Sequence, residues 1–159
     1  MHLYEAHLPV TDTTVSETFY RKVLGLPFAY RDPARDIVFL WADEKRKSMI
    51  GLWGASTGYG RQNGVLTRSH LAFAVSFEQL RSAIRKLNDF GIETRGFAGN
   101  ATCEPSVIGW MPSAQIYFLD PDEHSLEIIT LLAEPPNAGF IGSYSEWLNL
   151  NRGSSAAGG

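Results

Sequence analysis

Two histidines and one glutamate occupy strand-like segments in which ionisable side chains are unusual. Glu127 follows Leu126 and precedes two isoleucines, and a carboxylate buried in such a place costs several kcal/mol unless it is paired or binds a cation. His7 and His70 lie in two further apolar segments, residues 3–10 and 69–75. Two imidazoles and one carboxylate can hold a divalent metal ion and leave positions open for water or substrate. Histidines that only form hydrogen bonds within a sheet are the alternative interpretation.

The alternation of side chains along each strand places these three residues on the less apolar face. His7 shares its face with Glu5, whereas Ala6, Leu8 and Val10 point the other way. His70 lies on the opposite face of its strand from Leu71, Phe73 and Val75, and Glu127 lies on the opposite face from Leu126 and Ile128. The three strands therefore need to present one common face for the residues to form a site.

Composition limits the classes of function. The chain has 159 residues, 44% of them hydrophobic and 19% charged, with a net charge of −3. This length suits one domain or two small halves with a shared core. The charge gives no basic excess for binding nucleic acid. The sequence shows no membrane-spanning segment or signal pattern, so we expect a cytoplasmic protein. The single cysteine, Cys103, excludes an internal disulfide framework and a zinc-thiolate cluster, and we interpret it as a loop thiol.

A pattern of elements occurs twice in the chain. After the first strand, residues 11–14 supply helix-capping side chains, Glu17 completes a capping box with Thr14, and Gly25 ends the helix. Strands are expected at 28–31, 37–41 and 48–53. The segment 54–68 is rich in Gly, Ser and Thr and is expected to be a linker.

The second copy begins at residue 69. Ser76 and Gln79 form a capping box, Gly91 ends the helix, and a strand is expected at 93–97. The polar helix side chains Arg81, Arg85 and Lys86 are expected to be solvated. Residues 98–113 have no periodicity and are typical of a lid or binding loop. A β-hairpin around the turn Asp120-Pro121-Asp122 follows.

These elements predict an α+β fold of two βαβββ modules, at residues 1–54 and 69–132. One module cannot cover its own sheet, so the two are expected to pair as a curved mixed sheet around a cleft that holds the metal. Residues 137–150 are aromatic at helical spacing and predict an appended segment that packs on the body or on a second subunit. The tail 153–159 is expected to be disordered.

The sequence resembles the vicinal oxygen chelate superfamily, which includes glyoxalases, bleomycin-resistance proteins and ring-cleaving dioxygenases. The resemblance covers residues 3–132 and rests on four stretches: Glu-Ala-His-Leu-Pro-Val around His7, the helix end from Phe19 to Leu26, Ser-His-Leu-Ala-Phe around His70, and Tyr117 to Glu127. It implies one divalent metal ion, Zn, Ni, Mn, Co or Fe, held by His7, His70 and Glu127 and chelating substrate oxygens. It also implies a homodimer.

Lewis-acid stabilisation of an oxyanion is the chemistry that such a site supports. We therefore expect a glyoxalase-like enzyme that isomerises a small oxygen-rich substrate or adds a thiol co-substrate to it, with Glu127 and Tyr117 as catalytic residues. Relatives of glyoxalase I have a fourth ligand, whose place Gly51 is predicted to take, with Glu5 as a substitute. Thiol-transferring fosfomycin-resistance enzymes share the tyrosine matched by Tyr117, but the segment after Glu127 lacks their cationic residues.

Two alternatives stay open. A ring-cleaving dioxygenase uses the same ligand set and needs a further acid–base residue, for which Tyr117 and Tyr4 are candidates, whereas His124 is expected to face solvent in its turn. A bleomycin-resistance-type protein sequesters a ligand between aromatic walls without chemistry. Trp41, Trp53, Trp110 and Tyr117 could form such walls, and their packing into the core is the other interpretation. The candidate substrate-binding residues are Trp41, Trp53, Trp110 and Met111.

Overall fold

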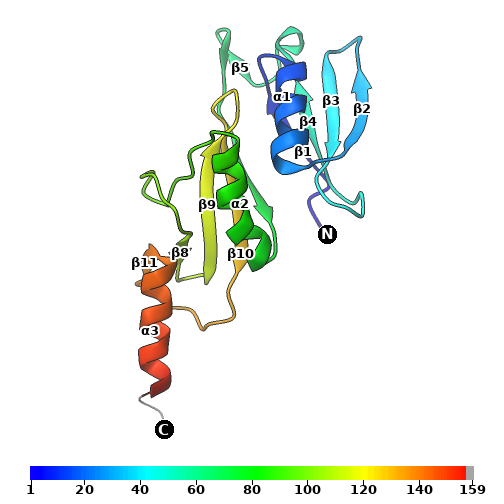
Figure 1. Ribbon diagram of the computed structural model, residues 1–159. Coiled ribbons are helices and arrows are strands. Elements are labelled where there is room, and N and C mark those ends of the chain that lie inside the picture. Colours follow the sequence, from blue (N-terminus) through cyan, green and yellow to red (C-terminus); the bar gives the residue numbers. More distant parts are fainter. Residues whose placement is uncertain (157–159) are drawn as a thin grey trace. The chain divides into compact units, whose positions relative to one another are not determined.

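The computed structural model describes residues 1–156 as a mixed α+β fold (Figure 1). The chain forms two compact units, each built around its own sheet. The first unit contains residues 1–69 together with Asp120–His124, and the second contains His70–Leu119 and the chain from Ser125 onward. Among the described residues, no helix has the length and apolar character needed to cross a membrane.

The first unit contains the predicted βαβββ module. Its elements are β1 (Glu5–Pro9), α1 (Thr13–Phe19), the π-helical turn η1 (Tyr20–Leu24), β2 (Phe28–Asp32), β3 (Ile37–Trp41) and β4 (Met49–Trp53). The strand order is β1-β4-β3-β2, with β1 parallel to β4 and the other pairs antiparallel. Gly25 adopts a left-handed conformation after η1 (φ 76°), which confirms it as the residue that ends the helix.

The start of α1 differs from the prediction. Asp12, not Thr14, caps the helix, because its carboxylate accepts hydrogen bonds from the N–H groups of Thr14 and Val15. The predicted capping box with Glu17 is therefore wrong. Glu17 instead pairs with Arg21 and Arg31, at 2.9 and 2.5 Å. The segment expected to be a linker forms a short helix η2 (Ala55–Thr57) and a hairpin of β5 (Arg61–Gln62) and β6 (Val65–Leu66).

The two faces of the first sheet have different compositions. One face buries a core of aliphatic residues, namely Leu8, Val38, Leu40, Ile50 and Leu52, and α1 packs on β3 and β4. The other face carries Glu5 and His7 from β1, with Gly51 and Trp53 from β4 beside them. The predicted alternation around His7 is therefore confirmed.

The turn Asp120–His124 belongs to the first unit although the strands on either side of it belong to the second. His124 is fully buried: its Nδ1 accepts a hydrogen bond from the N–H of Ser69 at 3.0 Å, and its Nε2 donates to the carbonyl of Pro9 at 2.7 Å. The expectation that His124 faces solvent is wrong, because both ring nitrogens have partners far away in the sequence.

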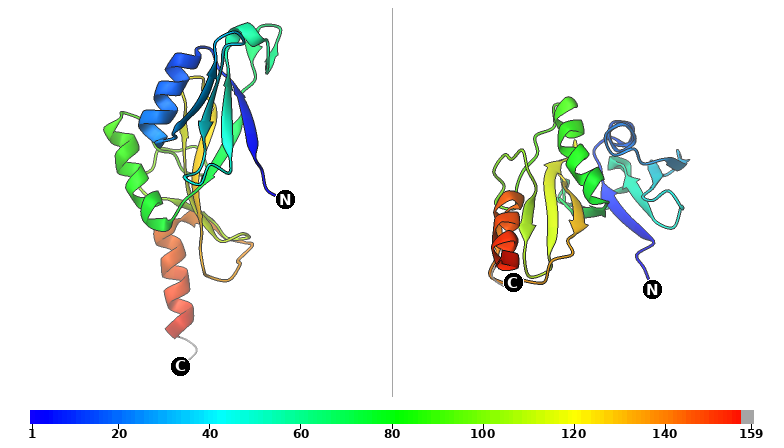
Figure 2. Two further views of the ribbon diagram at one scale, coloured as in Figure 1. Left: turned by 90° about the vertical axis from the view of Figure 1, so that its right-hand side faces the viewer. Right: turned by 60° about the horizontal axis from the view of Figure 1, so that its bottom comes forward.

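The second unit repeats the topology of the first. It contains β7 (His70–Ala74), α2 (Phe77–Asp89), β8 (Ser106–Ile108), β9 (Ser113–Leu119) and β10 (Ser125–Leu131), followed by β11 (Ile141–Ser143). The order is β11-β8-β9-β10-β7, with β7 parallel to β10. The capping box of Ser76 and Gln79 at the start of α2 is confirmed. The helix covers one face of the sheet and buries Leu80, Ile84 and Leu87 (Figure 2).

The strand predicted at 93–97 is not formed. In this segment only Arg95 makes bridges, to Tyr117 and Ala101. The first strand after α2 is β8, which lies within the stretch predicted to be irregular. It pairs with β9 through the tight turn at residues 109–112, so the hairpin, not the first apolar segment after α2, completes the sheet.

The C-terminal segment packs on the second unit. β11 pairs with β8, and α3 (Tyr144–Ala156) follows directly. Trp147 of α3 is fully buried, with its ring 5.0 Å from that of Phe140. Of the tail predicted to be disordered, residues 153–156 belong to α3, and residues 157–159 lie outside the described part of the chain.

Candidate metal and substrate site

His70 and Glu127 are adjacent in the second unit because β7 and β10 are parallel neighbours. His70 pairs with Ser125, and Glu127 lies two residues farther along β10 on the same face. The imidazole Nε2 is 3.0 Å from Glu127 Oε2, and the Ser125 hydroxyl is 3.2 Å from Nδ1. When Nε2 donates to the carboxylate, Nδ1 is free to accept from the hydroxyl. The glutamate is only 6% exposed, so its charge lies in a poorly hydrated place.

Tyr117 joins this pair from β9, directly opposite Glu127. Burial raises the pKa of the Tyr117 hydroxyl well above its usual range, and the charge and hydrogen bond of Glu127 raise it further, whereas the Gln115 amide acts in the opposite direction. The tyrosine consequently stays protonated and donates its hydrogen to the carboxylate. Its ring lies 6.2 Å from that of His70.

These three residues line a pocket of about 430 Å³, which is in the size range of sites for small ligands. Arg95 and Phe97 form another part of its wall. Arg95 is held there by two backbone hydrogen bonds with Tyr117, of 2.8 and 2.9 Å, and its Nε donates to Glu93 at 2.8 Å. Arg95 was not predicted as a site residue, because the local sequence does not indicate its bridge to Tyr117.

His7 lies in the first unit within an aromatic cluster. Its Nε2 is 2.6 Å from Glu5 Oε1, and its ring is 4.9 Å from that of Trp53 and 5.7 Å from that of Tyr59. A Cβ atom on Gly51 would approach His7 Cδ2 to 2.9 Å, so glycine is needed for the imidazole to lie against β4. Tyr59, from the segment after η2, was not anticipated by the sequence analysis.

Gly51 of β4 pairs with His7, as Ser125 of β10 pairs with His70. Trp53 lies two residues farther along β4, and its ring is 4.9 Å from that of His7. That Gly51 takes the place of a fourth ligand stays a prediction.

The predicted substrate-binding residues are distributed over both units. Trp53 lies beside His7, and Trp41 is on the same face at the other end of the β3–β4 pair. Trp110 and Met111 lie in the turn between β8 and β9 and are 63% and 37% exposed. This turn precedes β9, whereas Tyr117 is near the end of that strand. Trp110 and Met111 are therefore not brought together with the pocket at His70.

The donor atoms of the second unit suit a divalent metal ion. Within residues 1–156, no three His, Cys, Asp or Glu side chains gather in a group that could hold a metal. Two of the predicted donors, His70 Nε2 and Glu127 Oε2, are nevertheless adjacent, and Glu127 has no Lys or Arg partner in the described chain. Imidazole nitrogen and carboxylate oxygen are accepted by Zn, Ni, Mn, Co and Fe. Ser125 stands where a residue that orients a ligating imidazole is expected. The role of His7 as third ligand remains a prediction.

Both units contain a βαβββ module in which the first strand lies parallel beside the last. This duplicated module defines the class of protein to which the chain belongs. A family model described as the glyoxalase/bleomycin resistance protein/dioxygenase superfamily matches residues 2–128. The chain belongs to this superfamily. No curated protein sequence matches the chain.

Solved structures with the same fold include proteins of different activities. An integron cassette protein from the mobile metagenome of Halifax Harbour sewage outfall is 26% identical with a TM-score of 0.68, over 82% of this chain and 98% of that one. Lactoylglutathione lyase from Agrobacterium tumefaciens is 20% identical (TM-score 0.62; 81% and 92% covered). A fosfomycin resistance protein from Listeria monocytogenes is 18% identical (0.58; 84% and 95%). At such identities the latter two share the fold alone.

Proposed function

We propose that the protein is a divalent-metal-dependent, glyoxalase-like enzyme that acts on a small oxygen-rich substrate in the pocket at His70 and Glu127. The observation that carries the proposal is the Glu127 carboxylate. It is almost completely buried, and its neighbours are a histidine and a tyrosine, with no lysine or arginine partner among the described residues. A buried anion without a cationic side chain is costly, and a metal ion would compensate its charge.

His70 and Glu127 would hold the ion, with His7 as the third ligand. When bound, such an ion supplies Lewis-acid stabilisation of negative charge on a substrate oxygen. The chain's own residues have separate tasks. Ser125 fixes the imidazole of His70, and Tyr117 donates a hydrogen bond to Glu127, which orients the carboxylate. A Glu127 oxygen can accept a proton from the substrate.

Arg95 supports the view that the substrate carries an acid group. Its guanidinium is a permanent cation on the wall of the pocket, and it is hydrogen bonded on one side only, to Glu93. The remaining N–H groups can bind a carboxylate or phosphonate oxygen. Phe97 provides an apolar surface beside it. Isomerisation and thiol addition are both compatible with this arrangement, the latter with a thiol as co-substrate.

The proposal is tested by metal binding. Protein stripped of metal would be titrated calorimetrically with Mn²⁺, Ni²⁺ and Zn²⁺, beside Glu127→Gln, His70→Ala and His7→Ala. Glu134→Gln is the matched control, because it removes a carboxylate from the same unit outside the pocket. We expect one ion per chain in the unmodified protein and in the control, and at least about tenfold weaker binding in the other variants. Equal metal binding by all variants would refute the assignment of these residues as metal ligands.

A ligand-sequestering protein is the second candidate, favoured by the cluster of Phe39, Trp53 and Tyr59 around His7. Trp53 Nε1 is buried and has no hydrogen-bond acceptor among the described residues. Tight binding of a planar aromatic compound by metal-stripped protein, followed by tryptophan fluorescence, would favour this function. For a ring-cleaving dioxygenase, His124 is not available as an acid–base residue because both of its nitrogens are engaged.

A further inference from the structure

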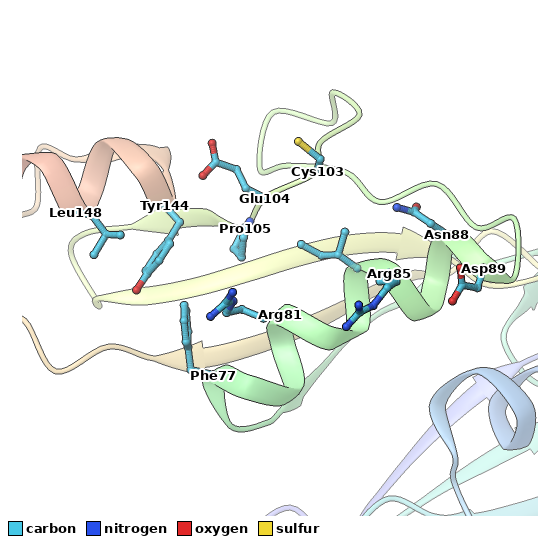
Figure 3. A pocket seen from close by; sticks show the side chains of 11 residues that line it. Phe77, Arg81, Arg85, Asn88, Asp89, Cys103, Glu104, Pro105, Tyr144 and Leu148 are labelled. Atoms are coloured by element: carbon cyan, nitrogen blue, oxygen red, sulfur yellow. The ribbon is translucent and has the colours of Figure 1, made fainter.

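A second cavity lies in the second unit, outside the pocket at Glu127. It has a volume of about 830 Å³ and runs along α2, with the loop at Cys103–Pro105 and the start of α3 as its other wall (Figure 3). None of its lining residues lines the pocket at Glu127. On α2 the lining positions recur every three or four residues from Phe77 to Asn88, so they form one continuous face about 16 Å long.

One end of this groove is apolar and firmly built. The rings of Phe77 and Tyr144 are 4.8 Å apart, and Leu148 lies one helical turn after the tyrosine. The wall that α3 forms is fixed, since Tyr144 N–H donates to the carbonyl of Pro105 at 2.9 Å. The buried Trp147 anchors the same turn of the helix. The groove is therefore a preformed feature of the unit.

The middle of the groove is cationic. Arg81 and Arg85 lie one turn apart on α2 and both line the cavity, so two like charges repel each other there. Neither guanidinium has a hydrogen-bond or ion-pair partner within the described chain. Other arginines donate to carboxylates or carbonyls, including Arg21, Arg31, Arg35, Arg61, Arg68 and Arg95. Both side chains are exposed, which agrees with the expectation that they are solvated, and both also line the cavity.

The acidic residues of the groove do not neutralise these two arginines. Glu104 Oε2 accepts hydrogen bonds from the hydroxyl and the N–H of Ser145, at 2.6 and 3.0 Å, and thereby caps the start of α3. Asp89 is at the far end of α2, beyond Asn88, and makes no ion pair with Arg85. A ligand's acid group is consequently favoured at the arginines and disfavoured at the end with Asp89.

We propose that this groove binds a small amphipathic carboxylate. Its acid group lies between Arg81 and Arg85, and its apolar body covers Phe77, Tyr144 and Leu148. Guanidinium groups form paired hydrogen bonds with carboxylates, and the apolar end offers the contact area that orients the rest of the molecule. This site is independent of the metal site and of the proposed function.

The test uses phenylacetate and its neutral isostere phenylacetamide as probes of the full-length protein, followed by heteronuclear NMR. We expect phenylacetate to shift amide signals of α2, residues 103–105 and the start of α3, with at least about tenfold weaker binding of phenylacetamide. The double variant Arg81→Gln/Arg85→Gln should lose a similar factor. Lys86→Gln, which removes a neighbouring charge that does not line the groove, should bind phenylacetate as the unmodified protein does.

Cys103 gives a second readout, since it is the single cysteine of the chain and lines the groove. Saturating phenylacetate should slow alkylation of this thiol by iodoacetamide, and phenylacetamide at equal concentration should not. The proposal is overturned if acid and amide bind equally, if the double variant matches Lys86→Gln, or if the shifted signals lie only around Glu127. Metal binding plays no part in these measurements, so their failure would not affect the proposed function.

Discussion

Replacement of Tyr20 by phenylalanine tests whether the turn Asp120–His124 stabilises the first unit. The Tyr20 hydroxyl donates to Asp120 Oδ2 at 2.8 Å, and both residues are buried, at 0% and 5% exposure. The other carboxylate oxygen, Oδ1, accepts from the N–H groups of Asp122 and His124. In the described chain Oδ2 has no donor besides Tyr20. Tyr20→Phe therefore leaves a buried oxygen unpaired without changing the shape of the core.

The expected cost is about 2 kcal/mol at neutral pH, the size of a hydrogen bond to a charged group, which corresponds to a fall in Tm of about 4–8 °C. The way this free-energy cost changes with pH follows from the ionisation of Asp120. Burial raises the pKa of this carboxyl, and the hydrogen bond from Tyr20 is among the interactions that oppose the rise. The carboxyl therefore binds its proton more tightly in the folded than in the unfolded chain, and stability falls as pH rises through the folded pKa.

Since Tyr20 stabilises the charged carboxylate, its loss costs most above the folded pKa of Asp120 and least below it, where the carboxyl is protonated. Urea unfolding of the unmodified protein and of Tyr20→Phe across the acidic to neutral range measures this difference. Tyr30→Phe is the matched control, because Tyr30 is 57% exposed and its change should be close to zero. A loss for Tyr20→Phe below about 0.5 kcal/mol, or one independent of pH, would refute the reasoning.

Further predictions concern the two histidines and the ion pairs of Glu17. Gly51→Ala should displace the His7 ring, because the new Cβ would lie 2.9 Å from its Cδ2; we expect a loss of about 1–3 kcal/mol in chemical unfolding, and an unchanged stability would contradict the close approach. Ser125→Ala removes the hydroxyl at His70 Nδ1 and should weaken metal binding about tenfold in calorimetry with little effect on Tm. Burial raises the pKa of Glu17, but hydrogen bonds and charges of Arg31 and Arg21 outweigh it and leave the pKa lowered, so Glu17→Gln should destabilise the protein at neutral pH. This difference in unfolding free energy should vanish as pH falls through the carboxyl's pKa.

Much of the site could be predicted from the sequence because strand alternation is a local property. The faces assigned to His70 and Glu127 depend only on the parity of their positions within strands, and the register of β7 and β10 agrees with it. The helix ends at Gly25 and Ser76 were also readable, since capping uses residues next to one another in the chain.

What could not be predicted depends on partners distant in the sequence. His124 is in a turn, which suggests exposure, but its partners Pro9 and Ser69 are 115 and 55 residues away. The first strand after α2 was expected at residues 93–97, but the hairpin with β9 is formed by Ser106–Ile108. Arg95 enters the pocket through its bridge to Tyr117. Pairing choices of this kind are decided by the whole sheet.

The position of the turn Asp120–His124 has a consequence for synthesis of the protein. The chain passes between the two units at residues 69–70, again at 119–120 and a third time at 124–125. During translation the first unit is thus incomplete until His124 has left the ribosome, although its sheet ends at residue 53. A gene divided at residue 69 would yield a first fragment without its turn, whose hydrogen bonds to Tyr20 and Pro9 would be missing. If the two modules were made as separate chains, the first unit would be complete only when the turn Asp120–His124 of the second chain bound to it.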